Sequence, residues 1–536
     1  MLALGFSAGL PFLLVFDTLS AWLRSAGVSL EVIGFFSLVT MIYAFKFLWA
    51  PLVDRTSVPV LTKWLGHRRS WMLVSQALIM FGLWLIAGSD PVRGLGVVAA
   101  FALLVGFSSA TQDIAIDAWR IEAADVSRQG ALAAAYTWGY RGATLVAGAV
   151  PLLMADAYGW RASYAVMAAL MLVGVVGVLA APPEGQHSVR SMHAEDLPSA
   201  PVLEGLEWAV RLAILMSGAL VLGSGLTGNA GALAGALSAL GATGVSRMAL
   251  AAWASEARVW IHLLAIVLGG VVVALSTLPA PGRRTRPGVY LSSALGDPLR
   301  DFFTRYGSTT ALMLALVCAY RIPDFILNIM NPFYLDSGFT LVEIAEVRKI
   351  FGVAMTMVGV LAGGYAVARY SLLRALVAGA FAGSLSNLVF VWLATRGHDV
   401  PALFVAIGVE NATQGFAATC LIAYMSGMTS AAFTATQYAL LSSLYAIPGK
   451  VLGSQSGRIV ERAAQAAEAG GILGQFKGFF AGLTPESFAG AVERSGVSPV
   501  SLGTGYATFF AYTALTGLVP IVLALMILRR QERSTN

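Results

Sequence analysis

The chain has 536 residues, of which 57% are hydrophobic and 12% are charged, and its net charge is +6. Soluble domains carry about 25% charged residues, so this composition excludes a soluble globular protein and predicts a polytopic membrane protein. No long basic run or nucleic-acid motif is present, which argues against a nucleic-acid partner. The two cysteines, Cys318 and Cys420, lie in apolar runs, so we expect no disulfide framework, metal site or other cofactor.

Apolar runs of about 20 residues, the length of a helix that crosses the hydrocarbon core, recur along the chain. The first six cover residues 3–24, 31–52, 70–88, 95–119, 130–155 and 160–181. Two more, at 207–228 and 257–278, flank a segment rich in glycine, alanine and serine. The last six cover residues 308–334, 341–366, 371–394, 401–428, 432–454 and 505–528. The sequence therefore predicts an all-α fold with two six-helix bundles and two extra central helices, about 14 spans in total.

These runs predict three parts. We expect an N-terminal bundle at 1–181, a central linker with the two extra helices at 182–306, and a C-terminal bundle at 307–536. Lysine and arginine gather in alternate loops, which places both termini in the cytoplasm. A long insert at about 456–504 then lies outside, where it is expected to form one or two short amphipathic helices on the membrane surface.

The two sets of six runs look like copies of one another. Similar segments at 26–34 and 337–345 lead into the second run of each set, at an offset of 311 residues. The same offset aligns Asp17 with Asn328, and it predicts a cytoplasmic leader before Met1. Paired halves of six helices are the architecture of major facilitator transporters, whose substrate site lies between the halves near the bilayer midplane.

The fourth run ends in the segment ATQDIAIDAWR, which contains Gln112, Asp113, Asp117 and Arg120. The last three are spaced four and three residues apart, so on a helix they share one face. Because charged side chains are costly in lipid, this face should point at other helices or at a wet cavity. Two interpretations stay open, a network that locks the fourth helix to its neighbours and a role in transport, for which Asp113 and Asp117 are candidate proton carriers.

Several longer motifs resemble one known family. They are GFSAGLPF at 5–12, KFLWAPLVDR at 46–55, GHRRSW at 66–71, ATQDIAIDAWR at 110–120, GYRGA at 139–143 and FTATQYALLSSL at 433–444. Together they are similar to the AmpG-type muropeptide permeases of the major facilitator superfamily, over most of the chain. This resemblance implies proton-driven import of anhydro-muropeptides across the bacterial inner membrane for cell-wall recycling. We expect a monomer in the lipid bilayer that works by alternating access.

The loop signature of the superfamily is altered here. Ala50 replaces the usual glycine, and about twelve residues separate Arg55 from the basic triplet that begins at His67. Residues expected to form the gating loop are Lys46, Asp54, Arg55, Arg68, Arg69 and Arg120. Lys46 either snorkels toward the cytoplasmic surface or pairs with Asp17 or with an aspartate of the fourth helix.

A muropeptide offers hydroxyls, amides and carboxylates, so its site needs polar partners, aromatic faces and a fixed cation. Arg141 is the candidate cation, because guanidinium binds carboxylates through two parallel hydrogen bonds, although it could instead pair with Asp113 or Asp117. Trp138 and Tyr140 could stack on sugar rings or simply pack. The other candidate substrate ligands are Asp17, Gln112, Arg321, Asn328, Asn411 and Gln414.

The second half offers its own candidates for proton coupling. Arg321 and Asp324 are three residues apart, with Pro323 expected to kink their helix. Either they form a local ion pair that lowers the cost of insertion, or Asp324 changes protonation during turnover. Glu410 has no cation within one turn of its own helix, which makes it a second candidate proton carrier.

Other functions must be weighed against transport of muropeptides. The related acetyl-CoA transporters share a similar fourth-helix motif. Asp113 and Asp117 could bind Mg²⁺ in an intramembrane prenyltransferase, but the matching segment of the second half has Gly415 where an aspartate is needed. A sensor without flux is a third alternative. No phosphate-binding P-loop motif is present, so ATP drive has no support, and we expect a transporter rather than an enzyme.

Overall fold

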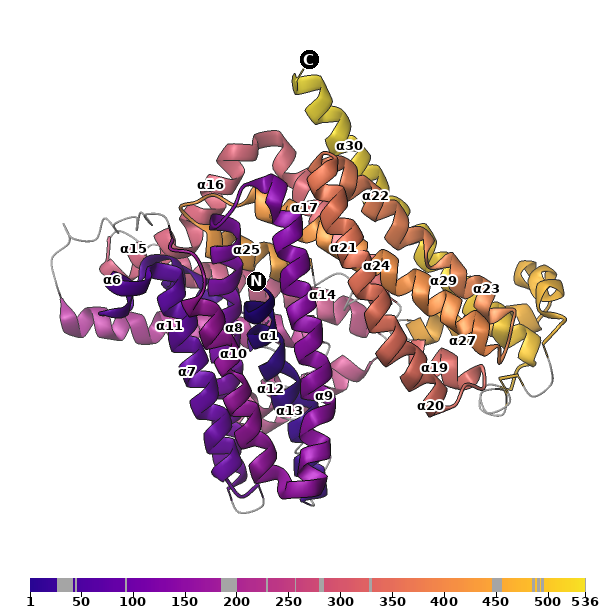
Figure 1. Cartoon of the computed structure of the whole chain (residues 1–536), viewed down its shortest axis with the longest axis horizontal. Helices are drawn as coiled ribbons and strands as arrows, with labels where there is room; N and C mark the ends of the chain where they lie inside the picture. Colours follow the sequence, from indigo (N-terminus) through magenta and orange to yellow (C-terminus); the bar gives the residue numbers. More distant parts are fainter. Residues whose placement is uncertain are drawn as a thin grey trace. The chain divides into compact units, whose positions relative to one another are not determined.

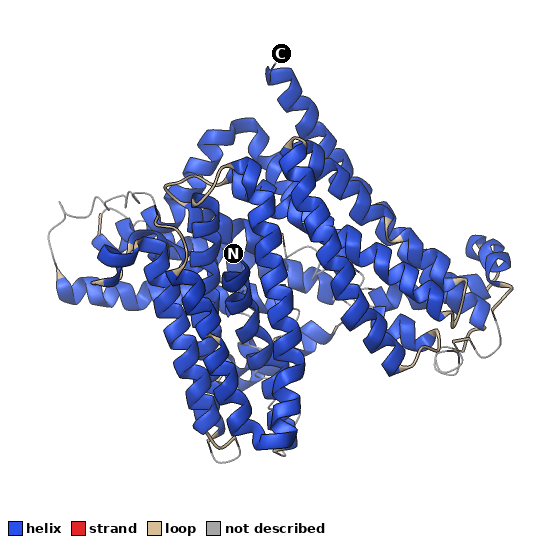
Figure 2. Cartoon of the chain, viewed as in Figure 1, coloured by secondary structure: helices blue, strands red, loops and turns tan. Residues whose placement is uncertain are grey.

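The computed structural model describes residues 1–26, 42–43, 46–91, 94–184, 200–227, 230–255, 257–278, 284–326, 330–445, 456–483, 487–488, 492 and 496–535. Within these ranges every regular element is a helix, and no strand is present (Figure 2). In hydrocarbon the backbone has to satisfy its own N–H and C=O groups, which a helix does locally. The predicted all-α class is confirmed.

Two compact units make up the chain, and each is described by itself. Unit 1 contains Met1–Val126, Ala135–Gly307 and Ser426–Ser443. Unit 2 contains Ser127–Ala134, Ser308–Met425 and Leu444–Asn536. The colours of Figure 1 follow the chain through both units. The domain boundaries expected at residues 181 and 306 stay predictions.

Unit 1 opens with α1 (Leu2–Leu13), the π-helical turn η1 (Leu14–Thr18) and α2 (Leu19–Ser25). There follow η2 (Lys46–Leu48), α5 (Ala50–Arg55), α6 (Leu61–Leu65), α7 (His67–Gly88), α8 (Leu95–Glu122), most of α9 (Val126–Leu170) and α10 (Leu172–Leu179). α9 comprises two helical runs that meet at Gly159, where a φ of 83° interrupts the helix. The predicted runs at 130–155 and 160–181 therefore follow one another almost without a loop.

Close backbone packing joins α1 to α9. A Cβ atom added at Gly5 would collide with the carbonyl oxygen of Tyr136, and one added at Gly139 would collide with that of Leu2. Small residues at such a crossing let two membrane helices approach backbone to backbone. This packing fixes the position of α9, which carries the candidate residues Trp138, Tyr140 and Arg141.

The central segment contributes two long helices, α11 (Pro201–Thr227) and α14 (Arg258–Thr277), that pack along each other. The shorter α12 (Gly231–Ala239) and α13 (Thr243–Ala254) lie between them in the sequence. The buried side chain of Arg211 donates to the carbonyl oxygens of Ser276 and Leu278, at 2.7 and 2.8 Å, and so ties α11 to the end of α14. Unit 1 continues with α15 (Arg286–Leu291), η3 (Ser292–Gly296), α16 (Asp297–Tyr306) and most of α25 (Thr434–Leu444).

Unit 2 begins with η4 (Gly307–Thr309), α17 (Thr310–Ala319), α18 (Ile322–Ile326) and α19 (Met330–Asp336). There follow α20 (Leu341–Ile344), η6 (Ala345–Phe351), α21 (Gly352–Arg369), α22 (Leu372–Leu385), α23 (Leu388–Ala394) and α24 (Val400–Met428). It ends with α27 (Ser456–Glu468), η7 (Ile472–Phe480), α29 (Pro499–Thr516) and α30 (Leu518–Thr535). The interruption between α17 and α18 falls just before Pro323, where the sequence predicts a kink.

The described residues contain nine helical stretches long and apolar enough to cross a membrane, which confirms a multi-pass membrane protein. Ten of the predicted runs overlap them, because the stretch Arg128–Leu179 holds parts of two. The other four runs overlap none of these stretches. The run at 3–24 is divided by η1, and the run at 401–428 has a polar middle. The run at 31–52 lies largely outside the described residues, and the run at 432–454 is described only to residue 445. The count of 14 is not confirmed.

The insert expected at 456–504 contains α27 and η7, and it ends earlier than expected because α29 starts at Pro499. α27 is amphipathic: Val460 and Ala464 are buried, whereas Glu461 and Arg462 are exposed. A Cβ atom added at Gly505 of α29 would lie 2.7 Å from the carbonyl oxygen of Val460. The apolar face of α27 thus packs on α29 rather than on lipid.

A carboxylate fastens the end of α27 to the start of α29. Glu468 Oε2 accepts from the backbone N–H of Ser498 at 3.1 Å and from its hydroxyl at 2.6 Å. The pKa of Glu468 is lowered to about 2, because the ionised carboxylate is favoured by hydrogen bonds from the hydroxyls of Ser498 and Ser501 and from the Ser498 N–H.

Acid should therefore weaken the contact between Glu468 and the start of α29 only at low pH. Because the folded-state pKa is depressed, the stabilisation is complete above about pH 4.5 and is lost as the pH falls toward 2. We expect amide hydrogen exchange at the first turn of α29 to become faster in that pH window. The free energy that protects these amides should fall by less than about 1 kcal/mol, because the site is exposed. Glu468→Gln should show the faster exchange already at pH 6 and no further step on acidification, and an unchanged acid step in that variant would contradict the assignment.

Candidate functional site

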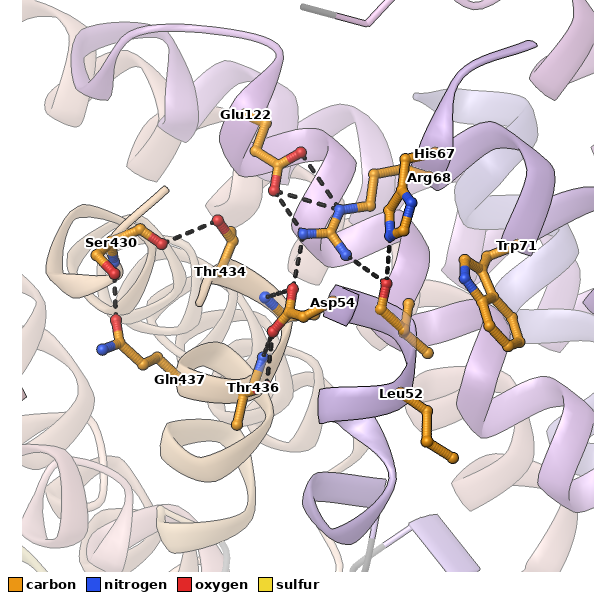
Figure 3. A network of polar contacts seen from close by, with 12 residues as sticks. Leu52, Asp54, His67, Arg68, Trp71, Glu122, Ser430, Thr434, Thr436 and Gln437 are labelled. Atoms are coloured by element: carbon orange, nitrogen blue, oxygen red, sulfur yellow. Dashed lines mark hydrogen bonds and ion pairs between the residues drawn. The ribbon is translucent and has the colours of Figure 1, made fainter. Parts of the chain in front are cut away.

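The end of α5 and the start of α7 converge on a buried ionic network in unit 1 (Figure 3). The guanidinium of Arg68, which is 0% exposed, lies 2.7 Å from Asp54 Oδ1 and 2.8 Å from Glu122 Oε1. It also donates to the carbonyl oxygen of Val53 at 2.9 Å, and a ring nitrogen of His67 lies 2.6 Å from the same oxygen. All three nitrogen atoms of this guanidinium donate hydrogen bonds inside the protein, so its position is fixed.

The carboxylate of Asp54 meets the N-terminus of α25 on its other side (Figure 3). Asp54 Oδ2 accepts from the backbone N–H of Thr436 at 2.8 Å and from its hydroxyl at 2.6 Å, and Oδ1 accepts from the Ala435 N–H at 3.2 Å. The first N–H groups of a helix have no intrahelical acceptor and carry a partial positive charge. Asp54 therefore joins segments that are nearly 400 residues apart in the sequence.

One residue further along α25, Gln437 connects the same region to α16. Its amide nitrogen donates to the carbonyl oxygen of Pro298 and to Asp301 Oδ2, both at 2.9 Å, and its amide oxygen accepts from Arg305 at 2.9 Å. On the α5 side, Arg55 donates to Ser293 in η3. η3 and α16, which follow the central helices α11 to α14, thus contact both α5, which contains Asp54, and α25, which donates to it.

The N-terminus of α7 is capped by a carboxylate from beyond α10. Glu184 accepts from the N–H of Arg68 at 2.8 Å and from the N–H of Arg69 at 2.6 Å. The side chain of Arg69 donates to the carbonyl oxygens of Val178 and Leu179 at the end of α10. Arg69 therefore has a structural role here, because it ties α7 to α10.

Gly66 is required where the chain enters α7. Its φ is 96°, and an added Cβ would lie 2.9 Å from the Glu184 carboxyl carbon. We expect Gly66→Ala to destabilise the protein by roughly 1–3 kcal/mol, because the backbone conformation is strained for alanine and the cap is displaced. Gly88→Ala is the matched control, since nothing lies within 4 Å of its added Cβ. Equal unfolding temperatures of the two variants would contradict the capping role of Glu184.

On α8 the two aspartates have different surroundings. Asp117 lies 3.4 Å from Arg120 and 3.9 Å from Lys46, so it is held between two cations. Arg120 also donates to the Ser426 hydroxyl at 3.1 Å and lies 5.3 Å from the ring centre of Tyr438. The expected sharing of one helix face by Asp117 and Arg120 is confirmed, as is the pairing of Lys46 with an aspartate of this helix.

Asp113 and Gln112 contrast with Asp117. Within the described part of the chain, Asp113 Oδ1 and both amide atoms of Gln112 are buried without a hydrogen-bond partner. The hydroxyls of Ser108 and Ser109, one turn earlier, are in the same state. Leaving such groups unmatched costs about 1–3 kcal/mol each. This stretch of α8 therefore presents hydrogen-bonding capacity that neighbouring side chains do not use.

The candidate substrate ligands on α9 differ in exposure. Arg141 has an exposed side chain, whereas Trp138 and Tyr140 are half-buried. Tyr140 lies in a tilted ring contact with Tyr136, with 6.1 Å between the centroids. Tyr140 therefore packs against an aromatic neighbour on one side, which is compatible with either of the two roles considered for it.

In unit 2, the polar residues of α18 and α24 meet. Arg321 Nε donates to Asp324 Oδ2 at 2.8 Å, and Gln414 Nε2 donates to Asp324 Oδ1 at 2.6 Å. The local ion pair considered for Arg321 and Asp324 is therefore present, and Gln414 joins it from the tenth predicted span of the paired set. Glu410 forms a second group with Asn411, 2.6 Å away, and Asn411 Oδ1 accepts from the Thr356 hydroxyl at 2.9 Å.

Two candidates lie where the structure gives no side-chain description. Asn328 falls outside the described residues, and Asp17 lies in η1 with its side chain outside them. Sequence reasoning also missed several residues that complete the networks, namely Glu122, Glu184, Thr436 and Gln437. The motif FTATQYALLSSL contains the last two, so their position in it was the available signal.

Comparison with known proteins bears on the identity of the chain. The family model described as acetyl-coenzyme A transporter 1 matches residues 1–94. The anhydromuropeptide permease of Escherichia coli K12 is 30% identical over 464 residues, which cover 86% of this chain and 74% of that protein. The putative transporter AmpG 4 of Rickettsia felis is 26% identical over 460 residues, covering 85% of this chain and 88% of that protein.

Among solved structures, the proton:xylose symporter XylE is similar to the chain with a TM-score of 0.49 and 9% identity, over 96% of this chain and 92% of that one. The sequence relatives are permeases and transporters, which confirms the prediction of a transporter rather than an enzyme. With 30% identity to the Escherichia coli permease over most of its length, the chain belongs to the AmpG-type muropeptide permease family of the major facilitator superfamily.

Proposed function

We propose that the protein imports anhydro-muropeptides across the bacterial inner membrane by alternating access, in symport with protons and with both termini in the cytoplasm. Its relation to the anhydromuropeptide permease of Escherichia coli is the observation that carries this proposal. The match of residues 1–94 to an acetyl-coenzyme A transporter model favours acetyl-CoA as the second candidate substrate. Both solutes are anionic, so both need a fixed cation in the pathway.

Arg141 is the proposed ligand for a carboxylate of the peptide stem. Its side chain is exposed, and Trp138 and Tyr140 adjoin it in the sequence, so that sugar rings could stack beside the bound carboxylate. Gln112, Asn411 and Gln414 are proposed to serve the hydroxyl and amide groups. The unused hydrogen-bonding capacity of Gln112 supports this assignment on the α8 side.

The surroundings of the two α8 aspartates support separate roles for them. Asp117 is proposed to orient Lys46 and Arg120, because it lies between these cations. Asp113 is proposed to carry a proton, because its Oδ1 is buried without a hydrogen-bond partner among the described residues. In unit 2 the carriers are proposed to be Asp324, whose partner Arg321 can hold the charge after proton release, and Glu410.

The gating role proposed for Asp54 and Arg68 follows from their contacts. Each turnover of an alternating-access carrier must break and remake the contacts that close one side. The hydrogen bonds between Asp54 and the N-terminus of α25 are charge-assisted, worth about 1.5–3 kcal/mol each, and can be broken without unfolding either helix. Arg68 and Glu122 are proposed to hold the Asp54 carboxylate in place for this contact.

Uptake of radiolabelled anhydro-muropeptide into energised right-side-out vesicles tests the proposal. Accumulation that an uncoupler abolishes and that excess unlabelled muropeptide inhibits would support it, whereas inhibition by acetyl-CoA alone would select the second candidate. Arg141→Lys should raise KM at least tenfold, because lysine cannot form the bidentate pair. Arg161→Lys, an exposed arginine elsewhere on α9, is the matched control, and equal KM values would remove Arg141 from the substrate site.

A further inference from the structure

The helix η7 carries large apolar side chains that nothing in the described chain covers. Ile472 is 78% exposed, Phe476 48% and Phe479 74%, and the rings of the two phenylalanines stack with 6.5 Å between their centroids. We call these three residues the apolar ridge. Single exposed apolar residues are ordinary, but three within one nine-residue element form a patch that marks an interaction surface.

The position of η7 along α29 identifies what faces the ridge. A Cβ atom at Gly503 would lie 3.1 Å from both Phe480 and Leu483, so the end of η7 packs on the first turn of α29. α29 starts at Pro499 and opens a candidate membrane span that continues to Glu532. Four residues of helix advance about 6 Å. η7 therefore lies alongside the first two turns of a helix that is long and apolar enough to cross a membrane.

The outer surface of this span continues onto η7. Residues 501–507 of α29 are buried, and α27 and η7 pack against this helix together with α23. Exposed apolar side chains resume further along, at Tyr512 and Leu515. At the start of α29, where the helix itself is buried, the exposed apolar surface is provided by the ridge. Beside the covered start of α29, the exposed apolar side chains of the insert are thus those of Ile472, Phe476 and Phe479.

Polar groups gather on the other part of the insert. Glu461, Arg462 and Gln465 are exposed on α27, and Lys477 of η7 lies 3.4 Å from the Glu468 carboxylate. The insert therefore has a charged helix suited to water and an apolar edge suited to hydrocarbon, which is the arrangement of an interfacial membrane anchor.

We propose that the apolar ridge inserts into the lipid surface, at the boundary between headgroups and acyl chains, and that α27 stays in water. Interfacial helices place their apolar face about 5–10 Å into this boundary. The anchor holds the outer end of α29 at the membrane surface. This assignment does not depend on which solute is carried.

Depth-dependent fluorescence quenching tests the proposal on the full-length protein. Bimane is attached to Phe479→Cys or Ile472→Cys in a background with Cys318→Ser and Cys420→Ser, and the protein is placed in phosphatidylcholine nanodiscs. Lipids brominated near the headgroup end of the acyl chain are expected to quench both labels at least twofold more strongly than lipids brominated at the chain terminus. Glu461→Cys, on the polar face of α27, is the matched control and should be quenched by aqueous iodide instead.

Two outcomes would overturn the assignment. Labels on the ridge that iodide quenches as strongly as the label at residue 461 would show that the ridge lies in water. Labels shielded from both bromolipid and iodide would show that a protein surface, such as a second copy of the chain, covers it. Phe476→Ser combined with Phe479→Ser gives a second test, because this variant should keep its monodisperse elution while the label at residue 472 loses at least half of its bromolipid quenching. Unchanged quenching there would also contradict the proposal.

Discussion

Arg68→Ala is expected to lower the unfolding temperature of the purified protein more than any other substitution named here. Arg68 is buried between Asp54 and Glu122, and its removal takes away the guanidinium that lies 2.7 Å from the buried Asp54 carboxylate. Breaking a buried ion pair from one side costs about 3–5 kcal/mol. Asp54 keeps the donors of Ala435 and Thr436, so the lower end of this range is expected. Thermal unfolding in detergent, followed by differential scanning fluorimetry, measures the effect.

An exposed arginine provides the control. Arg374 is 68% exposed at the side chain and lies 3.8 Å from Glu532, so Arg374→Ala removes a surface pair worth about 1 kcal/mol or less. A double-mutant cycle with Asp54→Asn should give a coupling energy above about 1 kcal/mol, because the two residues form one network. If Arg68→Ala and Arg374→Ala shifted the unfolding temperature equally, the network around Asp54 would not hold the fold together.

Asp324→Asn is expected to abolish uphill accumulation of substrate while leaving exchange of substrate across the membrane measurable. Asparagine keeps the shape of the carboxylate and can still accept from Arg321 or Gln414, but it cannot take up or release a proton. Each charge moved through 100 mV is worth about 2.3 kcal/mol, which supports a roughly forty-fold gradient that the variant would lose. Uptake and counterflow in the same proteoliposomes separate the two activities.

Asp336→Asn is the matched control for this experiment. Asp336 accepts a hydrogen bond from the Tyr506 hydroxyl, outside the group formed by Arg321, Asp324 and Gln414, and its neutralisation should leave accumulation within twofold. Normal accumulation by Asp324→Asn would remove this residue from the proton pathway. Loss of exchange together with accumulation would instead assign it a structural role, as the partner that neutralises Arg321.

Local spacing predicted the contacts that lie within one helix. Asp117 with Arg120 and Arg321 with Asp324 are each three residues apart, and both pairs form because such side chains share a helix face. The length of the apolar runs predicted most of the spans, because the thickness of the hydrocarbon core sets the length of a helix that crosses it. The number of spans was less predictable, because η1 divides the first run, and because the polar middle of α24 lowers the hydropathy of a helix that is continuous from Val400 to Met428.

Contacts between distant segments could not be predicted from spacing. Asp54 was expected to act in a loop, but its partners lie on α25, and no periodicity relates positions so far apart. Glu184 was not considered, because its role depends on where the chain passes after α10. The spacing on α8 also predicted the same surroundings for Asp113 and Asp117, which differ in the structure. Asp117 has two cationic neighbours, whereas Asp113 Oδ1 has no hydrogen-bond partner within the described residues. Burial and partners separate residues that spacing treats alike.

The crossing of α1 and α9 affects how variant libraries of this transporter should be interpreted. Gly5 and Gly139 each face a carbonyl oxygen of the opposite helix, so every side chain larger than hydrogen forces the two backbones apart. In a saturation mutagenesis screen scored by growth, both positions should tolerate substitution as poorly as Arg68, although neither contains a group that could bind a solute or a proton. Intolerance in such a screen would therefore map the steric fit of two helices as readily as the transport pathway.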